Sequence, residues 1–265
     1  MPTEMTAGSF FAQQPGALAP LTRALFRTAG LSPGMRVLDI GRGAGETALL
    51  AAEVVGERGF VIGIDHDPGI LEIARRQART TGLANVAFHE GEIWALPIDE
   101  PFDAVVGRLI LMHQPDPAAA LRALLPHLHP GGLVVCHEVD LHAPLVMPPL
   151  SQLTQILGWM TETATRAKTE SRMGAKLYSL FLAAGLPAPT MRADAVVGGG
   201  VALSACTVWS DLVRAMLPAM ERHGVVTTAE VEIETLADRL CAEVVAGGGC
   251  IATPTFVGAW ARKRS

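Results

Sequence analysis

The 265-residue chain has few cysteines, and none of them form a recognisable motif. Cys136, Cys206, Cys241 and Cys250 are scattered, without the Cys-x-x-Cys pair that marks zinc sites and redox motifs. Buried, reduced thiols are the simpler interpretation of this spacing. The cysteines therefore predict a cytoplasmic protein.

Long apolar runs and basic clusters are also scarce. The hydrophobic share is 49%, yet no uncharged apolar run approaches the roughly 18 residues of a membrane span. Residues 1–14 lack the basic region and apolar stretch of a secretory signal. The formal net charge is −5, and the basic residues cluster only at 262–264. Because nucleic-acid binding needs a concentrated basic surface, we predict no nucleic-acid partner. The absence of a long apolar run predicts no membrane association.

What the sequence does contain is a glycine-rich loop after a short apolar segment. Residues 37–40 predict a buried strand, and Gly41, Gly43 and Gly45 follow at alternate positions. Residues 47–55 then have the composition of a helix. Such a layout brings a ligand against backbone N–H groups at a helix N-terminus, where a Cβ would hold it off. The pattern is typical of a nucleotide-type binding loop.

Strands and helices alternate through the first 140 residues, which indicates a parallel sheet covered on both faces. The predicted strands cover residues 37–40, 59–65, 86–89, 102–107 and 133–136, and the predicted helices cover 17–29, 47–55, 67–80 and 117–128. The second half departs from this alternation. It predicts further helices at 150–167, 174–184, 206–222 and 228–245, with strands at 190–197 and 255–261.

Acidic residues stand at the ends of the first three strands. The loop reads Gly-x-Gly-x-Gly, and Glu46 takes the place of the last glycine of the dinucleotide pattern Gly-x-Gly-x-x-Gly. Asp39 would repel a pyrophosphate, and Glu92 adds a second acid nearby in the expected fold. Asp65 lies about twenty residues past the glycines, where an acid accepts from ribose hydroxyls. These acids favour a cationic ligand without phosphate.

These motifs resemble those of the class I S-adenosylmethionine-dependent methyltransferases, over most of residues 34–140. Residues 39–45 are similar to the first motif of the family, and residues 63–65 to its ribose-binding strand end. Residues 91–93 are similar to its adenine-binding turn, although the acid there is more often Asp. Residues 102–106, 115–117 and 129–132 resemble the fourth strand, the next helix start and the turn into the fifth strand.

The resemblance implies an α/β fold in a single domain over residues 1–265. Its Rossmann-like sheet would have seven strands, six parallel and the last antiparallel, with helices on both faces. The core would comprise residues of about 15–140, 174–200 and 250–265. Insertions at about 144–172 and 204–246 would then form a helical cap beside the substrate.

The resemblance also implies S-adenosyl-L-methionine as cofactor and S-adenosyl-L-homocysteine as product. Acids and glycines would hold its methionine and ribose parts, and the residues after the second and third strands would contact adenine. The implied cofactor-binding residues are Asp39, Gly41, Arg42, Gly43, Gly45, Asp65, His66, Glu92, Ile93 and Arg108. Arg108 is implied through its backbone carbonyl. Arg42 departs from the family pattern, in which a small residue is common, so its side chain is expected to point away or to pair with an acid.

Methyl transfer from a sulfonium needs little chemical activation of the donor. Positioning and exclusion of water supply most of the catalysis, and a base is required only for an acceptor that holds its proton. Candidates lie after the fourth and fifth strands, at the carboxyl edge of the sheet. We favour His113 as base, then His142, with Glu138 as either a catalytic group or a structural acceptor. Asp140 and His142 lack a third ligand nearby in sequence, so we predict no metal site.

The acceptor is the least determined part of the prediction. The acid cluster that follows the fourth strand in magnesium-dependent catechol enzymes is absent from this sequence. The Asn-Pro-Pro-Tyr-like motif of enzymes that methylate nucleic-acid bases is absent as well. We expect a small organic acceptor in specialised or quinone-like metabolism. A protein that binds the cofactor but catalyses a cyclisation or rearrangement is an alternative, and a non-enzymatic binding or regulatory subunit is another. The oligomeric state stays open, with a homodimer among the possibilities.

Residues of the expected cap would determine which acceptor fits. The apolar ones are more often core residues than substrate contacts. The candidates are Trp159, Met160, Arg166, Arg172, Met173, Trp209, Met216 and Met220.

Overall fold

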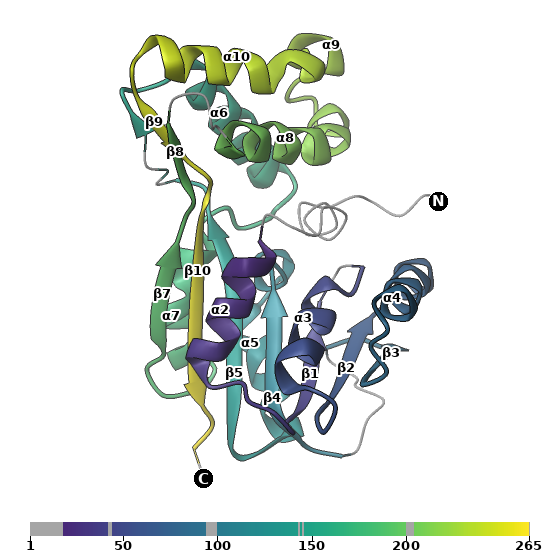
Figure 1. Ribbon diagram of the computed structural model, residues 1–265. Coiled ribbons are helices and arrows are strands. Elements are labelled where there is room, and N and C mark those ends of the chain that lie inside the picture. Colours follow the sequence, from purple (N-terminus) through teal and green to yellow (C-terminus); the bar gives the residue numbers. More distant parts are fainter. Residues whose placement is uncertain are drawn as a thin grey trace.

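The computed structural model describes residues 18–41, 44–93, 100–142, 144, 146–199 and 204–264. Seven strands form its main sheet in the order β3-β2-β1-β4-β5-β10-β7 (Figure 1). They are β1 (Arg36–Ile40), β2 (Phe60–Asp65), β3 (Val86–Glu90), β4 (Phe102–Arg108), β5 (Leu128–Asp140), β7 (Thr190–Asp194) and β10 (Thr255–Arg262). The pairs among β1 to β5 are parallel, and β10 runs antiparallel to both β5 and β7. This topology confirms the predicted α/β sheet.

Helices cover both faces of the sheet. On one face lie α2 (Ala19–Ala29), α3 (Glu46–Val55) and α4 (Pro68–Thr81), and on the other α5 (Pro117–Leu124) and α7 (Met173–Ala183). Side chains alternate between the faces of a strand. In β4, accordingly, Val106 belongs to the hydrophobic cluster under α2 and α3, and Val105 to the cluster on the opposite face. Each face of the sheet is therefore buried.

Local sequence features set the ends of the helices that approach the site. The Asp67 side chain accepts from the backbone N–H groups of Gly69 and Ile70 and so caps α4. Gly45 precedes α3 with φ +86°, and a Cβ there would lie 2.7 Å from the Ala74 Cβ. Only glycine therefore gives α3 this starting conformation and this close approach to α4.

A helical cap lies over the carboxyl ends of the parallel strands (Figure 1). It contains α6 (Ser151–Arg166), α8 (Ser204–Arg222), α9 (Thr228–Val231) and α10 (Ile233–Ala246). A small sheet of β6 (Val146–Met147), β9 (Cys250–Ala252) and β8 (Val197–Gly199) joins it to the main sheet. One hydrophobic cluster runs from Leu38 of β1 to Leu240 of α10. The cap and the main sheet thus share a core.

Within the described part of the chain, no helix combines the length and the apolarity that a membrane crossing needs.

Candidate cofactor and active site

A cavity of about 260 Å³ lies at the carboxyl ends of β1 and β2. Its lining includes Gly41 after β1, Asp65 and His66 at the end of β2, and Glu92 and Ile93 after β3. Ile110 and His113, from the segment that follows β4, also line it. The structure therefore brings together residues that the motifs single out separately.

Asp65 is held in a fixed orientation at this cavity. Its side chain is buried, and Oδ1 accepts from the Asp67 backbone N–H at 2.9 Å. The same oxygen lies 3.3 Å from Nδ1 of His66. Glu92, in contrast, is exposed to solvent at the cavity rim.

Asp39 carries a buried carboxyl group with unused bonding capacity. Its side chain is 5% exposed, and Oδ1 has no hydrogen-bond partner among the described residues. Burial raises the pKa of Asp39 to about 7, while the Arg108 guanidinium and the Ala48 backbone N–H act in the opposite direction. A Cβ on Gly41 would lie 3.7 Å from this oxygen. A carboxylate so placed fits a ligand ammonium group, which would supply the missing partner.

Arg108 forms a buried polar chain across the face of the sheet that carries α2 and α3. Its guanidinium pairs with the Glu46 carboxylate at the start of α3, and both side chains are less than 8% exposed. It also donates to the Thr22 hydroxyl of α2 at 3.2 Å. That hydroxyl lies 3.2 Å from Nδ1 of His137 on β5. Burial and the charges of Arg108 and Arg192 lower the pKa of His137 to about 3, so its imidazole is neutral.

This series of polar contacts is only partly predictable from the sequence. Arg108 is predicted to contact the cofactor through its backbone carbonyl, which says nothing of its side chain. Glu46 stands out in the sequence only because it takes the place of a glycine. Thr22 carries no motif signal, because its contact depends on how α2 packs. Two features of the sequence bear on these side-chain contacts: the helical spacing of apolar residues in α2 and the positions at which the strands end.

The three candidate catalytic residues occupy different environments. His113 ends the 3₁₀ helix η1 (Leu111–His113) and lines the cavity. Glu138 is fully buried, and its Oε1 accepts from the backbone N–H groups of Ile110 and Leu111 at 3.0 and 2.8 Å. Burial raises the pKa of Glu138 to about 7, although these N–H groups favour the ionised form. His142 is exposed, lies outside the cavity lining and has Nε2 3.0 Å from Ser171 Oγ.

Arg42 and Gly43 lie outside the described residues, so their predicted roles stay predictions.

Most of the apolar cap candidates belong to the protein core. Trp209 is fully buried, and its indole N–H donates to the Ala252 carbonyl at 2.8 Å. The other candidates that lie in or against the shared hydrophobic cluster are Trp159, Met160, Met173, Met216 and Met220.

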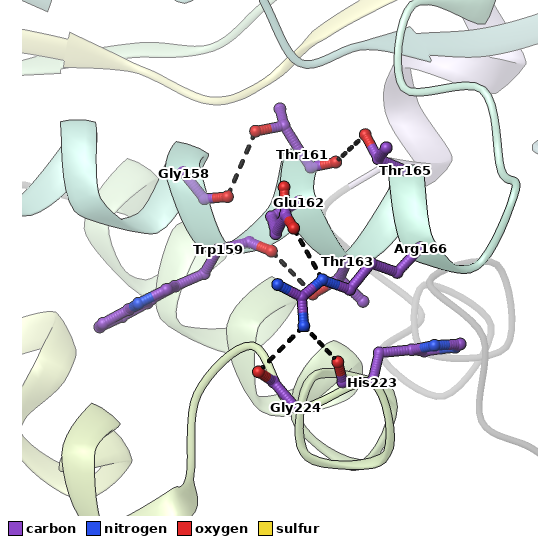
Figure 2. A network of polar contacts seen from close by, with 9 residues as sticks. All are labelled: Gly158, Trp159, Thr161, Glu162, Thr163, Thr165, Arg166, His223 and Gly224. Carbon is purple, nitrogen blue, oxygen red and sulfur yellow. Dashed lines mark hydrogen bonds and ion pairs between the residues drawn. The ribbon is translucent and has the colours of Figure 1, made fainter.

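Arg166 joins two elements of the cap, as Figure 2 shows. Its Nε donates to Glu162 at 2.7 Å, one turn earlier in α6. One of its terminal nitrogens donates to the carbonyls of His223 and Gly224, at 2.6 and 3.1 Å. Carbonyl groups at the end of α8 lack helical partners, and Arg166 supplies one. The contacts support a structural role for Arg166 within the cap.

Across the described residues, no group of three or more His, Cys, Asp or Glu side chains has a metal-binding arrangement.

A family model described as a methyltransferase domain matches residues 31–185. The chain belongs to this family, the class I S-adenosylmethionine-dependent methyltransferases, whose cofactor is S-adenosylmethionine. The YcgJ protein of Bacillus subtilis, a solved structure, has the same fold, with a TM-score of 0.59 and 21% identity over 93% of this chain and 99% of its own.

Two curated relatives illustrate the range of the family. An arsenite methyltransferase of Halobacterium salinarum is 37% identical over 117 residues, which are 44% of this chain and 30% of that protein. A ubiquinone/menaquinone biosynthesis C-methyltransferase of Shewanella oneidensis is 32% identical over 145 residues, 49% of this chain and 58% of that protein. The chain thus matches only 30% and 58% of the lengths of these two relatives.

Proposed function

We propose that the protein methylates a small organic acceptor with S-adenosylmethionine, by in-line displacement at an oxygen, nitrogen or carbon nucleophile. The observation that supports this most is the cavity that gathers Gly41, Asp65, His66, Glu92 and Ile93 at one edge of the sheet. Next to Gly41, the buried Asp39 oxygen fits a ligand ammonium group.

Each residue of the site has a role in this proposal. Asp65 accepts from the ribose hydroxyls, and its bond from the Asp67 N–H keeps it oriented. Glu92 and Ile93 contact the adenine edge, and His66 flanks the ring. Asp39 binds the methionine ammonium in its ionised form. S-adenosylmethionine, when bound, supplies a methyl group on a sulfonium that is already activated for displacement.

The acceptor is proposed from chemistry and from the relatives. The names of two relatives refer to arsenite and to quinone biosynthesis, both small molecules. Each alignment covers less than half of this chain, so the acceptor preference of neither carries over. We propose an acceptor in specialised or quinone-like metabolism, handled without a metal ion and in the cytoplasm.

His113 is the proposed base for an acceptor that keeps its proton at neutral pH. Its position in the cavity wall supports this choice over His142, which is exposed and bonded to Ser171. Glu138 is better suited to positioning, since its Oε1 is engaged by two backbone N–H groups. Through them it holds η1, which carries His113.

The test is incubation with methyl-labelled S-adenosylmethionine, EDTA and a panel of reduced quinones, phenols, amines and arsenite. We expect a labelled product and an equal amount of S-adenosylhomocysteine. At limiting S-adenosylmethionine, both should decrease in Asp65→Ala and stay at the wild-type level in the exposed control Asp116→Asn. A conversion of one acceptor without S-adenosylhomocysteine would instead support the cyclisation or rearrangement alternative. Absence of any S-adenosylmethionine binding by calorimetry would refute both and favour the non-enzymatic alternative. Loss of turnover in EDTA would refute metal independence.

A further inference from the structure

The Arg108 chain connects elements that are far apart in the sequence. Arg108 ends β4, Glu46 begins α3, and Thr22 belongs to α2. Because a guanidinium can only donate, the Thr22 oxygen accepts from it, and the Thr22 hydroxyl hydrogen is available to the neutral imidazole of His137. Two helices, α2 and α3, are therefore tied to the end of one strand, β4.

Strand register explains why these side chains meet. Arg108 lies opposite His137 in the pair of β4 with β5, and Val106 lies opposite Asp39 in the pair of β1 with β4. Since alternate residues of a strand share a face, Arg108 and Asp39 project toward α2 and α3 from neighbouring strands.

Gly258 of β10 allows α2 to approach this face. It lies opposite His137, and a Cβ at Gly258 would overlap the Leu25 side chain of α2. With glycine there, α2 lies close enough for Thr22 to reach both Arg108 and His137. The chain is thus built into the packing of the sheet.

Stability alone does not account for a buried ion pair at this position. Removing two charges from water costs much of what their attraction returns, and apolar pairs of similar volume are often as stable. The pair stands at the first residue of α3, directly after the glycine loop. Arg108 is also the charge that most favours the ionised form of Asp39.

We propose that Arg108 is a positioning residue of the cofactor site, which fixes the first turn of α3 against the end of β4 and holds a positive charge near Asp39. The ligand side of this inference rests on the function proposed above. The fork of the guanidinium matters as well as its charge, because it bonds Glu46 and Thr22 together.

The groups that face Asp39 set the sign of the expected pH effect. Asp65 on β2 favours the protonated form, whereas Arg108 on β4 and the Ala48 backbone N–H on α3 favour the carboxylate. Loss of Arg108 therefore raises the pKa of Asp39 further. Fewer molecules then carry the carboxylate at neutral pH, and raising the pH restores it.

The test compares the wild type with Glu46→Leu/Arg108→Met, in which an apolar pair replaces the ion pair. S-adenosylhomocysteine binding is measured by calorimetry at pH 6.5, 7.5 and 8.5. We expect binding about tenfold weaker than wild type at pH 7.5, with a smaller difference at pH 8.5. Backbone hydrogen exchange over residues 44–50 should be faster in the unliganded double variant.

The matched control is Arg23→Gln/Glu53→Gln. Arg23 and Glu53 also pair between α2 and α3, at 2.6 Å, but on the exposed surface. We expect wild-type affinity and wild-type exchange from this control. If the Glu46→Leu/Arg108→Met protein does not fold, Arg108→Lys takes its place. It keeps the charge but not the fork, so weaker binding with a wild-type pH profile is expected.

The outcomes separate this inference from the proposed function. If the wild type does not bind S-adenosylhomocysteine, the proposed function fails. Whether Arg108 fixes the first turn of α3 is then judged by hydrogen exchange alone. If exchange over residues 44–50 in the double variant equals that in the control, Arg108 does not fix the first turn of α3. Faster exchange with wild-type affinity would overturn the positioning role. An affinity loss in Glu46→Leu/Arg108→Met that is constant with pH, or one in Arg108→Lys that changes with pH, would overturn the charge effect on Asp39.

Discussion

Replacing Asp39 by asparagine should raise the free energy of unfolding of the unliganded protein, relative to wild type, as the pH increases. The same substitution should weaken ligand binding. The carboxyl group of Asp39 is buried, and its pKa rises from 3.8 to about 7. Between these values the folded chain keeps a proton that the unfolded chain releases. The contribution of Asp39 to stability is therefore complete below about pH 4 and is lost as the pH rises through 7.

The size of this effect follows from the shift. About three pKa units, at roughly 1.4 kcal/mol each, give up to about 4 kcal/mol. Asparagine cannot ionise, so Asp39→Asn does not lose this amount. Any constant cost of the substitution, such as an altered hydrogen bond from Ala48, cancels when the comparison is made across pH.

The assay is urea denaturation of wild type and Asp39→Asn at pH 5, 6, 7 and 8, with and without S-adenosylhomocysteine. We expect the free energy of unfolding of the variant to gain on wild type by about 2–4 kcal/mol over this range. S-adenosylhomocysteine should stabilise the wild type more, because only the carboxylate carries the charge that attracts an ammonium group. The exposed residue Asp116 gives the matched control Asp116→Asn, which should follow wild type at every pH.

Two results would refute this reasoning. A stability difference between wild type and Asp39→Asn that does not change with pH would mean that Asp39 is not desolvated in the unliganded protein. Equal stabilisation by S-adenosylhomocysteine would mean that Asp39 does not bind the ammonium group.

Three further substitutions test the cavity and its support. Asp65→Ala should weaken S-adenosylhomocysteine binding by about 1–3 kcal/mol in calorimetry, through loss of charged hydrogen bonds, and unchanged affinity would exclude the ribose role. His113→Ala should lower turnover with little change in S-adenosylhomocysteine affinity, because the side chain lines the cavity as the proposed base, and full activity would exclude this role. Glu138→Ala leaves two backbone N–H groups without their acceptor and should cost about 1–3 kcal/mol in urea denaturation, whereas a neutral effect would contradict its support of η1.

The sheet and the cavity are largely predictable from the sequence, because their signals are local. Each parallel strand ends in a short motif, and the carboxyl ends of parallel strands meet at one edge. The motifs alone therefore predict that Gly41, Asp65 and Ile93 lie together, and these residues line one cavity.

Side-chain partners across the sheet are harder to predict, since they depend on register and on helix packing. The sequence allows Glu138 to be either a base or a structural acceptor, because the path of the backbone after β4 decides which groups reach its side chain. Leu109 turns there with φ 53°, which lets the next two N–H groups meet Glu138. Arg108 is a similar case, because Glu46 and Thr22 approach it from different helices.

The cap shows the limit of helical periodicity. Its helices are visible in the pattern, but an apolar stripe does not reveal whether it faces a substrate or another helix. Trp209 and Met160 prove to be interior residues of the shared core. The acceptor preference cannot be derived from such residues.

The position of β10 has a consequence for how the chain is completed during synthesis. β7 pairs in the main sheet with β10, and β8 pairs in the small sheet with β9. Both partners follow α8, α9 and α10 in the chain. In a growing chain β5, β6, β7 and β8 therefore still lack a partner strand while the cap helices emerge, and such open edges allow wrong pairing. Because β10 inserts between β5 and β7, the sheet closes from its interior, after the cap has been made.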